Sequence, residues 1–320
     1  MTENVLDRIA LTGIVPVLTI QDAARAVPTV QAILAGGIDA VEIAFRTPAA
    51  AESIARAARE VPEMLVGAGT VLSLENAEEA VAAGARFLVA PGFNPKVAGW
   101  CCEHGVPFIP GCSTASEIEA AREMGYRRLK FFPAASAGGV ATLHDFAGPY
   151  TDVSFMATGG ITPENLSEFL AQKNVYAVGG GWLASPAAIA AGDWAQITAN
   201  CRSAVRRMHG FALQHVGINT ASAAEGERVA KLLSAMFDLP LEDRPDSCFV
   251  GSGFEVMKQP GLGTNGHIAI ACNDVGRAAA WLEKQGFAFR SEGRVEDASG
   301  LVCLYLRSEI AGFALHLRRR

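Results

Sequence analysis

A lysine in the middle of a short apolar run raises the first chemical question. Lys130 lies between Leu129 and the pair Phe131 and Phe132, within the segment 127–133. An ammonium group is costly to bury unless it is paired or neutralised. One interpretation is a lysine at a strand end whose ammonium reaches water. The other is an amine held near neutrality, which can attack a carbonyl carbon as a nucleophile. The other polar residues of the chain decide between them.

Two further polar residues offer what a nucleophilic lysine needs. Glu42 interrupts the apolar run 40–45, and Arg46 follows that run directly. Glu42 is either half of a structural ion pair or a general acid/base that moves protons between carbinolamine, imine and enamine. Arg46 is either a plain surface charge or a planar fork that binds a substrate carboxylate through two hydrogen bonds. The functional alternatives together predict imine chemistry on an α-keto acid.

The composition limits the classes of protein that need to be considered. The chain has 320 residues, of which half are apolar, so it can bury one large core or two unequal ones. A net charge of -6 argues against nucleic acid as the main partner. No apolar run is long enough to span a bilayer, and the first residues do not resemble a signal peptide. Seven cysteines without a CxxC pair indicate a reducing compartment, and we expect the cytoplasm.

An alternation of short apolar runs and amphipathic stretches organises the first 210 residues. The runs fall at 14–18, 40–45, 65–69, 87–91, 107–111, 129–132, 154–158 and 175–179. Helix candidates between them include 22–35, 49–60, 74–83, 115–124 and 163–171, and a longer helix is expected over 194–208. Strands that alternate with helices at short intervals indicate a parallel sheet. About eight units predict an α/β domain of the (β/α)8 TIM barrel type over residues 1–210. A doubly wound open sheet is the alternative, but residues 1–210 contain no GxGxxG turn.

Glycine turns follow the last two predicted strands of this barrel. Gly159 and Gly160 follow the seventh strand, and Gly179, Gly180 and Gly181 follow the eighth. Any one of them can be a simple tight connection. Two such turns in these places are typical of barrels that bind phosphate through backbone N–H groups and a helix dipole. A lysine, an acid, a carboxylate-binding arginine and a phosphate loop at one barrel mouth fit an α-keto acid that also carries a phosphate.

A series of short segments now shows a family resemblance. Residues about 8–208 resemble the class I aldolases for 2-keto-3-deoxy-6-phosphogluconate (KDPG) and 4-hydroxy-2-oxoglutarate (KHG). The matching segments, in order, are 13–17, 41–47 (Val-Glu-Ile-Ala-Phe-Arg-Thr), 66–71 (Val-Gly-Ala-Gly-Thr-Val), 90–92, 109–111, 129–134 (Leu-Lys-Phe-Phe-Pro-Ala), 158–161 and 179–183. The resemblance implies cleavage of a 4-hydroxy-2-keto acid to pyruvate and an aldehyde, either glyceraldehyde 3-phosphate or glyoxylate. It also implies a homotrimer and an aldolase without a cofactor.

The same resemblance assigns roles to individual residues. Lys130 would form the Schiff base with the keto acid, and Glu42 would shuttle protons. The expected substrate-binding residues at the carboxylate are Arg46, Thr70 and Thr158. Those at the phosphate are Gly159, Gly160, Gly180 and Gly181. Pro91 and Phe132 are also expected to contact the substrate.

Position 181 departs from the family pattern, which often has Gly-Gly-Ser-Trp-Leu where this chain has Gly-Gly-Gly-Trp-Leu. A hydroxyl donor to the phosphate is therefore missing, and a hydrogen bond to a charged group contributes about 1.5–3 kcal/mol. The departure leaves open an unphosphorylated 2-keto-3-deoxy sugar acid as substrate. A phosphate-binding barrel isomerase is a further alternative, but it would leave Lys130 without a role.

The remaining residues, 211–320, contain two segments that echo each other. Each begins with a histidine-containing strand, continues into a helix and ends in further strands. The pattern predicts a smaller α+β domain of two βαβββ repeats, and it resembles the vicinal-oxygen-chelate (glyoxalase and bleomycin-resistance) family. That resemblance implies a divalent metal, such as zinc, nickel, iron or manganese, held by His215, Glu255, His267 and His316. Alternatively, the histidines are ordinary strand residues. The domain as a whole is either a ligand- or metal-binding module that regulates the barrel or extends its assembly, or a separate metal-dependent enzyme that acts on a related keto compound.

Overall fold

The chain divides into two compact units, Met1–Met208 and His209–Arg320. The structure is a computed structural model that describes residues 4–298 and 300–320. In the described residues, no helix combines the length and the apolar character that crossing a membrane requires.

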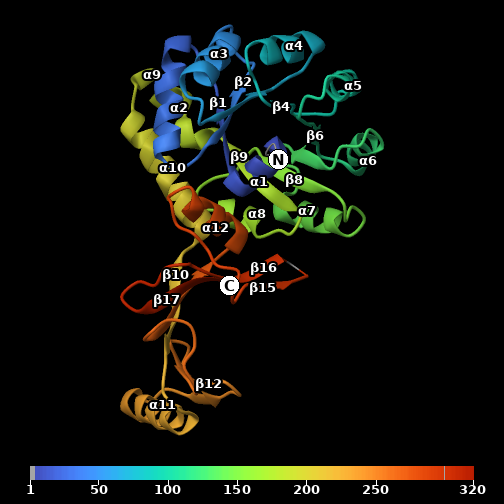
Figure 1. Ribbon diagram of the computed structural model, residues 1–320. Helices are drawn as coiled ribbons and strands as arrows, with labels where there is room; N and C mark the ends of the chain where they lie inside the picture. Colours follow the sequence, from blue (N-terminus) through green and yellow to red (C-terminus); the bar gives the residue numbers. More distant parts are fainter. Residues whose placement is uncertain (1–3, 299) are drawn as a thin grey trace. The chain divides into compact units, whose positions relative to one another are not determined.

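Parallel strands form the centre of the first unit, with helices following them along the chain (Figure 1). The strands are β1 (Ile14–Leu18), β2 (Ala40–Ala44), β3 (Leu65–Gly69), β4 (Leu88–Val89), β5 (Phe108–Ile109), β6 (Gly111–Cys112), β7 (Arg128–Phe131), β8 (Ser154–Thr158) and β9 (Val175–Gly180). They pair in the order β5-β4-β3-β2-β1-β9-β8-β7-β6, and every recorded pair is parallel.

One run of backbone closes this sheet into a nearly complete barrel. β5 and β6 stand at opposite ends of the pairing order, yet only Pro110 separates them in the sequence. β5 pairs with β4 and β6 pairs with β7, so the single run 108–112 joins both edges. The sequence predicted eight strands, whereas nine are assigned, because this run is interrupted at a proline that has no N–H to donate.

The helices and 3-10 turns of the first unit are α1 (Val5–Thr12), η1 (Ala23–Arg25), α2 (Ala26–Ala35), α3 (Ala50–Glu60), α4 (Leu74–Ala82), α5 (Pro95–Glu103), α6 (Ala115–Glu123), α7 (Gly139–Ala147), α8 (Leu166–Leu170), η2 (Gly181–Ala184), α9 (Pro186–Ala191) and α10 (Trp194–His209). The expected helix 163–171 begins later, at Leu166, because Asn165 accepts the N–H of Thr162 at 2.8 Å and holds a turn there. The expected helix 22–35 is divided between η1 and α2.

The buried core of the barrel shows which end of it is closed. Ala40 and Leu65, the first residues of their strands, belong to one apolar cluster with Phe87. Val5, Leu6 and Ala10 of α1 pack against this cluster. Helix α1 therefore covers the amino ends of the strands, and polar chemistry is left to the carboxyl ends.

In its described residues, the second unit is an eight-stranded sheet with two helices. Its elements are β10 (Ala212–Ile218), α11 (Ala223–Phe237), β11 (Leu241–Asp243), β12 (Ser247–Val250), β13 (Phe254–Met257), β14 (Gly266–Cys272), α12 (Val275–Glu283), β15 (Val295–Asp297), β16 (Gly300–Tyr305) and β17 (Phe313–Arg319). The strands pair in the order β11-β12-β13-β10-β14-β17-β16-β15, with β10 and β14 antiparallel at the centre.

Alternate residues of the strands pack against α11 and α12. The side chains between them point away from these helices. Val256 packs in a cluster with Ala230 of α11, and Leu317 packs in a cluster with Ala278 of α12. Successive side chains of a strand point to opposite faces. The neighbours of those core residues in sequence, Glu255 and His316, therefore point away from the helices, to a helix-free face of the sheet.

Candidate functional site

A buried ion pair lies within the barrel of the first unit. Nζ of Lys130, on β7, is 3.0 Å from Oε1 of Glu42, on β2. Only 4 % of Lys130 and 1 % of Glu42 is exposed. The second carboxylate oxygen of Glu42, Oε2, is buried and has no hydrogen-bond partner in the described residues. The pair thus offers an amine and an acceptor atom that is free to take a proton or a water molecule.

Small neighbours make room for this pair. A Cβ atom placed on Gly69 of β3 would lie 3.0 Å from the carboxyl carbon of Glu42, so a larger residue would displace the carboxylate. On the other side, the ring centroid of Phe132 is 5.6 Å from Nζ of Lys130. Pro91 follows β4, and its backbone leaves no room for a side chain at Gly111. Nζ of Lys130 therefore has an acid and an aromatic ring as neighbours.

A second polar pair follows β2 and β3. Arg46 donates from Nε to the Oγ1 atom of Thr70 at 3.1 Å. Thr70 has φ 58°, in the left-handed region that a β-branched residue rarely adopts. Such backbone strain is concentrated at functional sites. The threonine hydroxyl and the guanidinium are the donors that a carboxylate needs.

The two glycine turns differ in how much space they leave. Gly159 and Gly160 have φ 97° and 77°, and a Cβ on Gly160 would lie 2.4 Å from the Cβ of Ala135. A Cβ on Gly180 would lie 2.7 Å from the ring of Trp182, whereas one on Gly181 would meet only the carbonyl oxygen of Val17, at 3.4 Å. Three of these glycines are therefore required by geometry, and the fourth is not.

Thr158 ends β8 beside the first turn. Its hydroxyl Oγ1 is buried and has no partner in the described residues. A Cβ on Gly179 would lie 2.7 Å from that oxygen. Thr158 thus adds an unpaired donor close to the point where the glycine turns begin.

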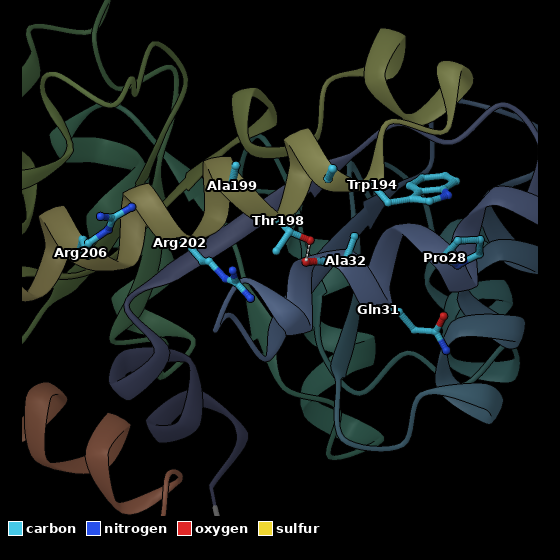
Figure 2. A pocket seen from close by; sticks show the side chains of 9 residues that line it. Pro28, Gln31, Ala32, Trp194, Thr198, Ala199, Arg202 and Arg206 are labelled. Atoms are coloured by element: carbon cyan, nitrogen blue, oxygen red, sulfur yellow. Dashed lines mark hydrogen bonds between the residues drawn. The ribbon is translucent and has the colours of Figure 1, made fainter.

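A cavity elsewhere in the unit does not mark this site. It has a volume of about 710 Å³ and lies between α2 and α10, where Trp194, Arg202 and Arg206 line it (Figure 2). Lys130, Glu42, Arg46 and the residues of the glycine turns do not line this cavity. Thr198 bridges the two helices there through a 2.8 Å hydrogen bond to the carbonyl of Ala32.

Comparison with known proteins supplies the decisive observation for the first unit. Residues 5–200 match the family described as "KDPG and KHG aldolase". The chain belongs to this aldolase family. A "2-dehydro-3-deoxy-phosphogluconate aldolase" of Treponema pallidum is 47% identical over 196 residues, which are 61% of this chain and 93% of that protein. The "KHG/KDPG aldolase" of Escherichia coli K12 is 42% identical over 200 residues, 62% of this chain and 94% of that protein.

A solved structure agrees with these relatives. The KDPG aldolase from Legionella pneumophila, with pyruvate captured at low pH as a covalent carbinolamine intermediate, is 36% identical. It matches with a TM-score of 0.62, over 64% of this chain and 99% of that one. The aldolase family match ends at residue 200, so it describes the barrel and leaves the second unit to be interpreted from its own geometry.

Three buried histidines and a glutamate meet on the helix-free face of the second unit. Ligand atoms of His215, His267 and His316 all lie within 4.8 Å of one another. Nε2 of His215 is 3.1 Å from Nε2 of His267, and Oε2 of Glu255 is 3.1 Å and 3.2 Å from these two atoms. The four residues come from β10, β13, β14 and β17. Positions far apart in the sequence are thus brought into one cluster.

The cluster keeps one ligand atom unpaired. Nε2 of His316 is buried and has no partner in the described residues, and its Nδ1 lies 3.5 Å from Sγ of Cys303. Burial lowers the pKa of His316 to about 3, and the charges of His267, His215 and Arg318 add to this effect. Burial alone would raise the pKa of Glu255, but hydrogen bonds from His215, His267 and Ser247 hold it below its usual value. At neutral pH, His316 is thus a neutral imidazole and Glu255 an ionised carboxylate, which are the forms that coordinate metal ions.

Two residues that shape this cluster were not predicted from the sequence. A Cβ on Gly217 would lie 2.1 Å from the ring of His267, so the absence of a side chain lets that imidazole cross β10. Ser247 donates its hydroxyl to Oε1 of Glu255 at 2.8 Å and orients the carboxylate. A glycine inside a strand, two residues after His215, is a signal of close approach that could have identified Gly217.

Proposed function

We propose that Lys130 is the amine that forms a Schiff base with the keto-acid substrate, and that Glu42 is its general acid/base. The chain is a class I aldolase that cleaves KDPG or KHG to pyruvate and an aldehyde. The observation that carries the assignment is the 3.0 Å contact between the buried Nζ of Lys130 and Oε1 of Glu42. An isomerase that uses only the glycine turns gives this pair no role.

The mechanism follows from the two side chains. Lys130 gives a proton to Glu42, and the free amine attacks the C2 carbonyl. Glu42 returns this proton to the carbinolamine hydroxyl, which leaves as water, and an iminium ion that can accept electrons remains. Glu42 then takes the proton of the C4 hydroxyl, directly or through one water, as the C3–C4 bond breaks and the aldehyde leaves. The remaining enamine takes a proton at C3, and hydrolysis releases pyruvate and regenerates the lysine. The unpaired Oε2 of Glu42 is the atom available for these proton transfers.

The remaining barrel residues are proposed to hold the two ends of the substrate. The 3.1 Å pair of Arg46 and Thr70 and the unpaired hydroxyl of Thr158 supply donors for the keto-acid carboxylate. Pro91 and Phe132 are proposed to form walls of the substrate site, and the ring centroid of Phe132 lies 5.6 Å from Nζ of Lys130. The backbone N–H groups of Gly159, Gly160, Gly180 and Gly181 are proposed to bind the phosphate of KDPG. An unphosphorylated sugar acid remains the second candidate substrate, because Gly181 lacks a hydroxyl.

Borohydride trapping tests the assignment. Incubation with pyruvate and borohydride should attach a stable adduct to Lys130, detected by peptide mass spectrometry. Lys130→Ala should lose both the adduct and the aldol activity while keeping the circular dichroism of the fold. Glu42→Gln, a matched variant of similar volume, should still trap pyruvate but lower kcat by about 10²–10⁴-fold. An adduct on another lysine, or an active Lys130→Ala variant, would refute the proposal.

For the second unit, we infer two βαβββ repeats of the vicinal-oxygen-chelate type around a divalent metal site. The succession of elements β10-α11-β11-β12-β13 and β14-α12-β15-β16-β17 supports the repeats. The residues present fit a metal ion, because three imidazoles and one carboxylate converge, and the buried Nε2 of His316 has no partner in the described residues. His215, Glu255, His267 and His316 would hold the ion, which would act as a Lewis acid toward a bound oxygen ligand. The second unit is then either a module that regulates the barrel or a separate metal-dependent enzyme.

Metal analysis tests this second proposal. Protein purified without chelators or affinity metals should carry up to one divalent ion per chain, measured by plasma mass spectrometry. His267→Ala should lower that content, while the aldolase activity of the barrel stays unchanged. Protein that contains no metal and binds none of zinc, nickel, iron or manganese on addition would make the unit a ligand-binding or structural module.

The assembly and the location of the chain remain proposals. We propose a homotrimer through the barrel, extended by the second unit if that unit also associates; mass measurement in solution tests it. The seven cysteines are all free thiols, which supports the cytoplasm.

A further inference from the structure

A cavity of about 590 Å³ opens on the helix-free face of the second unit. Its lining includes the side chains of Arg244, Arg318 and Arg320, together with Phe249 and His215. Three guanidinium groups in one small cavity are unusual in a chain of net charge -6. The only acidic residue in the lining is Glu242, whose carboxylate accepts from Nε and Nη2 of Arg244 at 2.8 Å and 2.9 Å.

The alternation of β17 explains how the arginines reach this cavity. His316, Arg318 and Arg320 are two residues apart, so they share the face that carries the histidines. Arg319, between them, lies on the opposite face and pairs with Asp297. His215 belongs to both the histidine cluster and the cavity wall. The cationic cavity is therefore continuous with the cluster.

Two of the three guanidinium groups have little to neutralise them. Arg318 is half-buried, and its guanidinium has no hydrogen-bond or ion-pair partner in the described residues. The Nη2 atom of Arg320 donates to the carbonyl oxygen of Gly210 at 2.5 Å, and no acidic partner of this guanidinium is found in the described residues. Arg244 is held in place by Glu242 and by the ring of Phe249, whose centroid is 4.0 Å from its Cζ. A half-buried cation without a counter-charge favours an anionic ligand, and planar forks suit carboxylate or phosphate oxygens.

We propose that this cavity is an anion-binding site that takes a small organic acid, with Arg318, Arg320 and Arg244 holding its anionic group. Its free volume falls within the range of small-molecule sites, and Phe249 supplies an apolar wall beside the charges. The far end of the ligand reaches His215. The barrel of the same chain consumes and releases keto acids, so its own substrate and product belong to the proposed ligand class. The anion site stands whether or not the histidines hold a metal.

Hydrogen exchange of the intact chain tests this site. Mass spectrometry would follow peptides that cover β10, β12 and β17, with sodium pyruvate, sodium phosphate or sodium chloride added at equal ionic strength. Pyruvate, phosphate or both should slow exchange there, by about tenfold at ten times the dissociation constant, while chloride should not. Protection by pyruvate alone identifies a carboxylate site, and protection by phosphate alone identifies a phosphate site. Peptides over β7 and β8 report pyruvate binding in the barrel separately.

Matched variants assign any protection to the arginines. Arg318→Met should raise the apparent dissociation constant about tenfold or more, because it removes charge-assisted hydrogen bonds. Arg319→Met removes the same charge from the opposite face and should leave the protection unchanged. If Arg318→Met alters exchange without ligand, Arg244→Met replaces it, since that side chain is 44% exposed. Absence of protection in the second unit, protection that survives both cavity variants, or equal loss in Arg319→Met would overturn the proposal.

Discussion

At the scale of single residues, the barrel is organised around one buried charge pair. Removing Lys130 and Glu42 from water is unfavourable by several kcal/mol for each ion, and their attraction offsets this only with good geometry. A pair of well-packed apolar residues would serve the fold at least as well. The pair is therefore better explained by chemistry than by stability. Its predicted roles came from charged residues inside apolar runs, a signal that the sequence carries without knowledge of contacts.

Gly181 gives a prediction about the phosphate end of the substrate. A serine fits there, because a Cβ would contact only the carbonyl oxygen of Val17 at 3.4 Å. Gly181→Ser should add a hydroxyl donor and raise kcat/KM for KDPG about tenfold, through a hydrogen bond of about 1.5 kcal/mol to a charged group. Cleavage of KHG, which has no phosphate, should not change. Steady-state kinetics with both substrates check this, and an equal gain for KHG would contradict it.

At the scale of elements, both clusters depend on glycines of neighbouring strands. Gly69 leaves space for Glu42, Gly179 for Thr158 and Gly217 for His267. The strands that carry these side chains can be predicted from the sequence, because short apolar runs and alternation are local signals. Which glycine faces which side chain cannot be predicted in this way, since that depends on the register between strands. The division of β5 and β6 at Pro110 and the late start of α8, where Asn165 accepts the N–H of Thr162, are local effects that apolar periodicity does not reveal.

Gly217 provides the test of this idea in the second unit. A Cβ at this position would lie 2.1 Å from the ring of His267, so Gly217→Ala should displace the imidazole. We expect zinc affinity to fall about 10–100-fold, the usual effect of disturbing the support of a ligand. Titration of the chelator-treated chain with zinc measures it. Gly253→Ala is the matched control, because no heavy atom lies within 4 Å of its Cβ. Equal affinities in the two variants would remove the proposed role of Gly217.

At the scale of the whole molecule, two buried histidines make the stability of the second unit depend on pH. His209 is buried against Phe211 and Trp281, with ring centroids 5.1 Å away in each case. Burial, followed by the charge of Arg277, lowers its pKa to about 4, and burial lowers the pKa of His316 to about 3. Below a pH of about 6.5 the unfolded chain binds protons that the folded unit does not. The second unit should therefore be most stable above this pH and lose stability as the pH falls.

His209→Phe isolates one part of this effect. The phenyl ring keeps the stacking on Phe211 and Trp281 and removes the titrating group. In the native chain His209 should reduce the free energy of unfolding of the second unit by about 2 kcal/mol between pH 7 and pH 5. The variant should lose that part of the pH dependence. Hydrogen exchange in peptides from residues 209–320 at the two pH values measures it, and an unchanged pH dependence would show that His209 remains neutral in the unfolded state or charged in the folded one.

The last prediction concerns the independence of the barrel. Lys130, Glu42 and the glycine turns all lie before Met208, where the first unit ends. The residues that match the Treponema pallidum aldolase span 93% of that protein, so a barrel of this length has a counterpart without the second unit. A chain of residues 1–208 should therefore keep kcat/KM within about twofold, a difference below 0.5 kcal/mol in transition-state stabilisation. The sequence alone predicted this division near residue 210, from the change in pattern after the helix 194–208.

A shorter chain supplies the control for that experiment. Residues 1–193 lack α10, which buries Ile197 and Cys201 fully against the unit. Gly36 is in such close contact with Cys201 that a Cβ there would lie 2.3 Å from the Cβ of the cysteine. Loss of this helix exposes an apolar face of the barrel, so the shorter chain should aggregate or unfold. If residues 1–208 fold with native circular dichroism but lose activity, the second unit supports catalysis directly. That result would favour a second unit that regulates the barrel over one that acts independently of it.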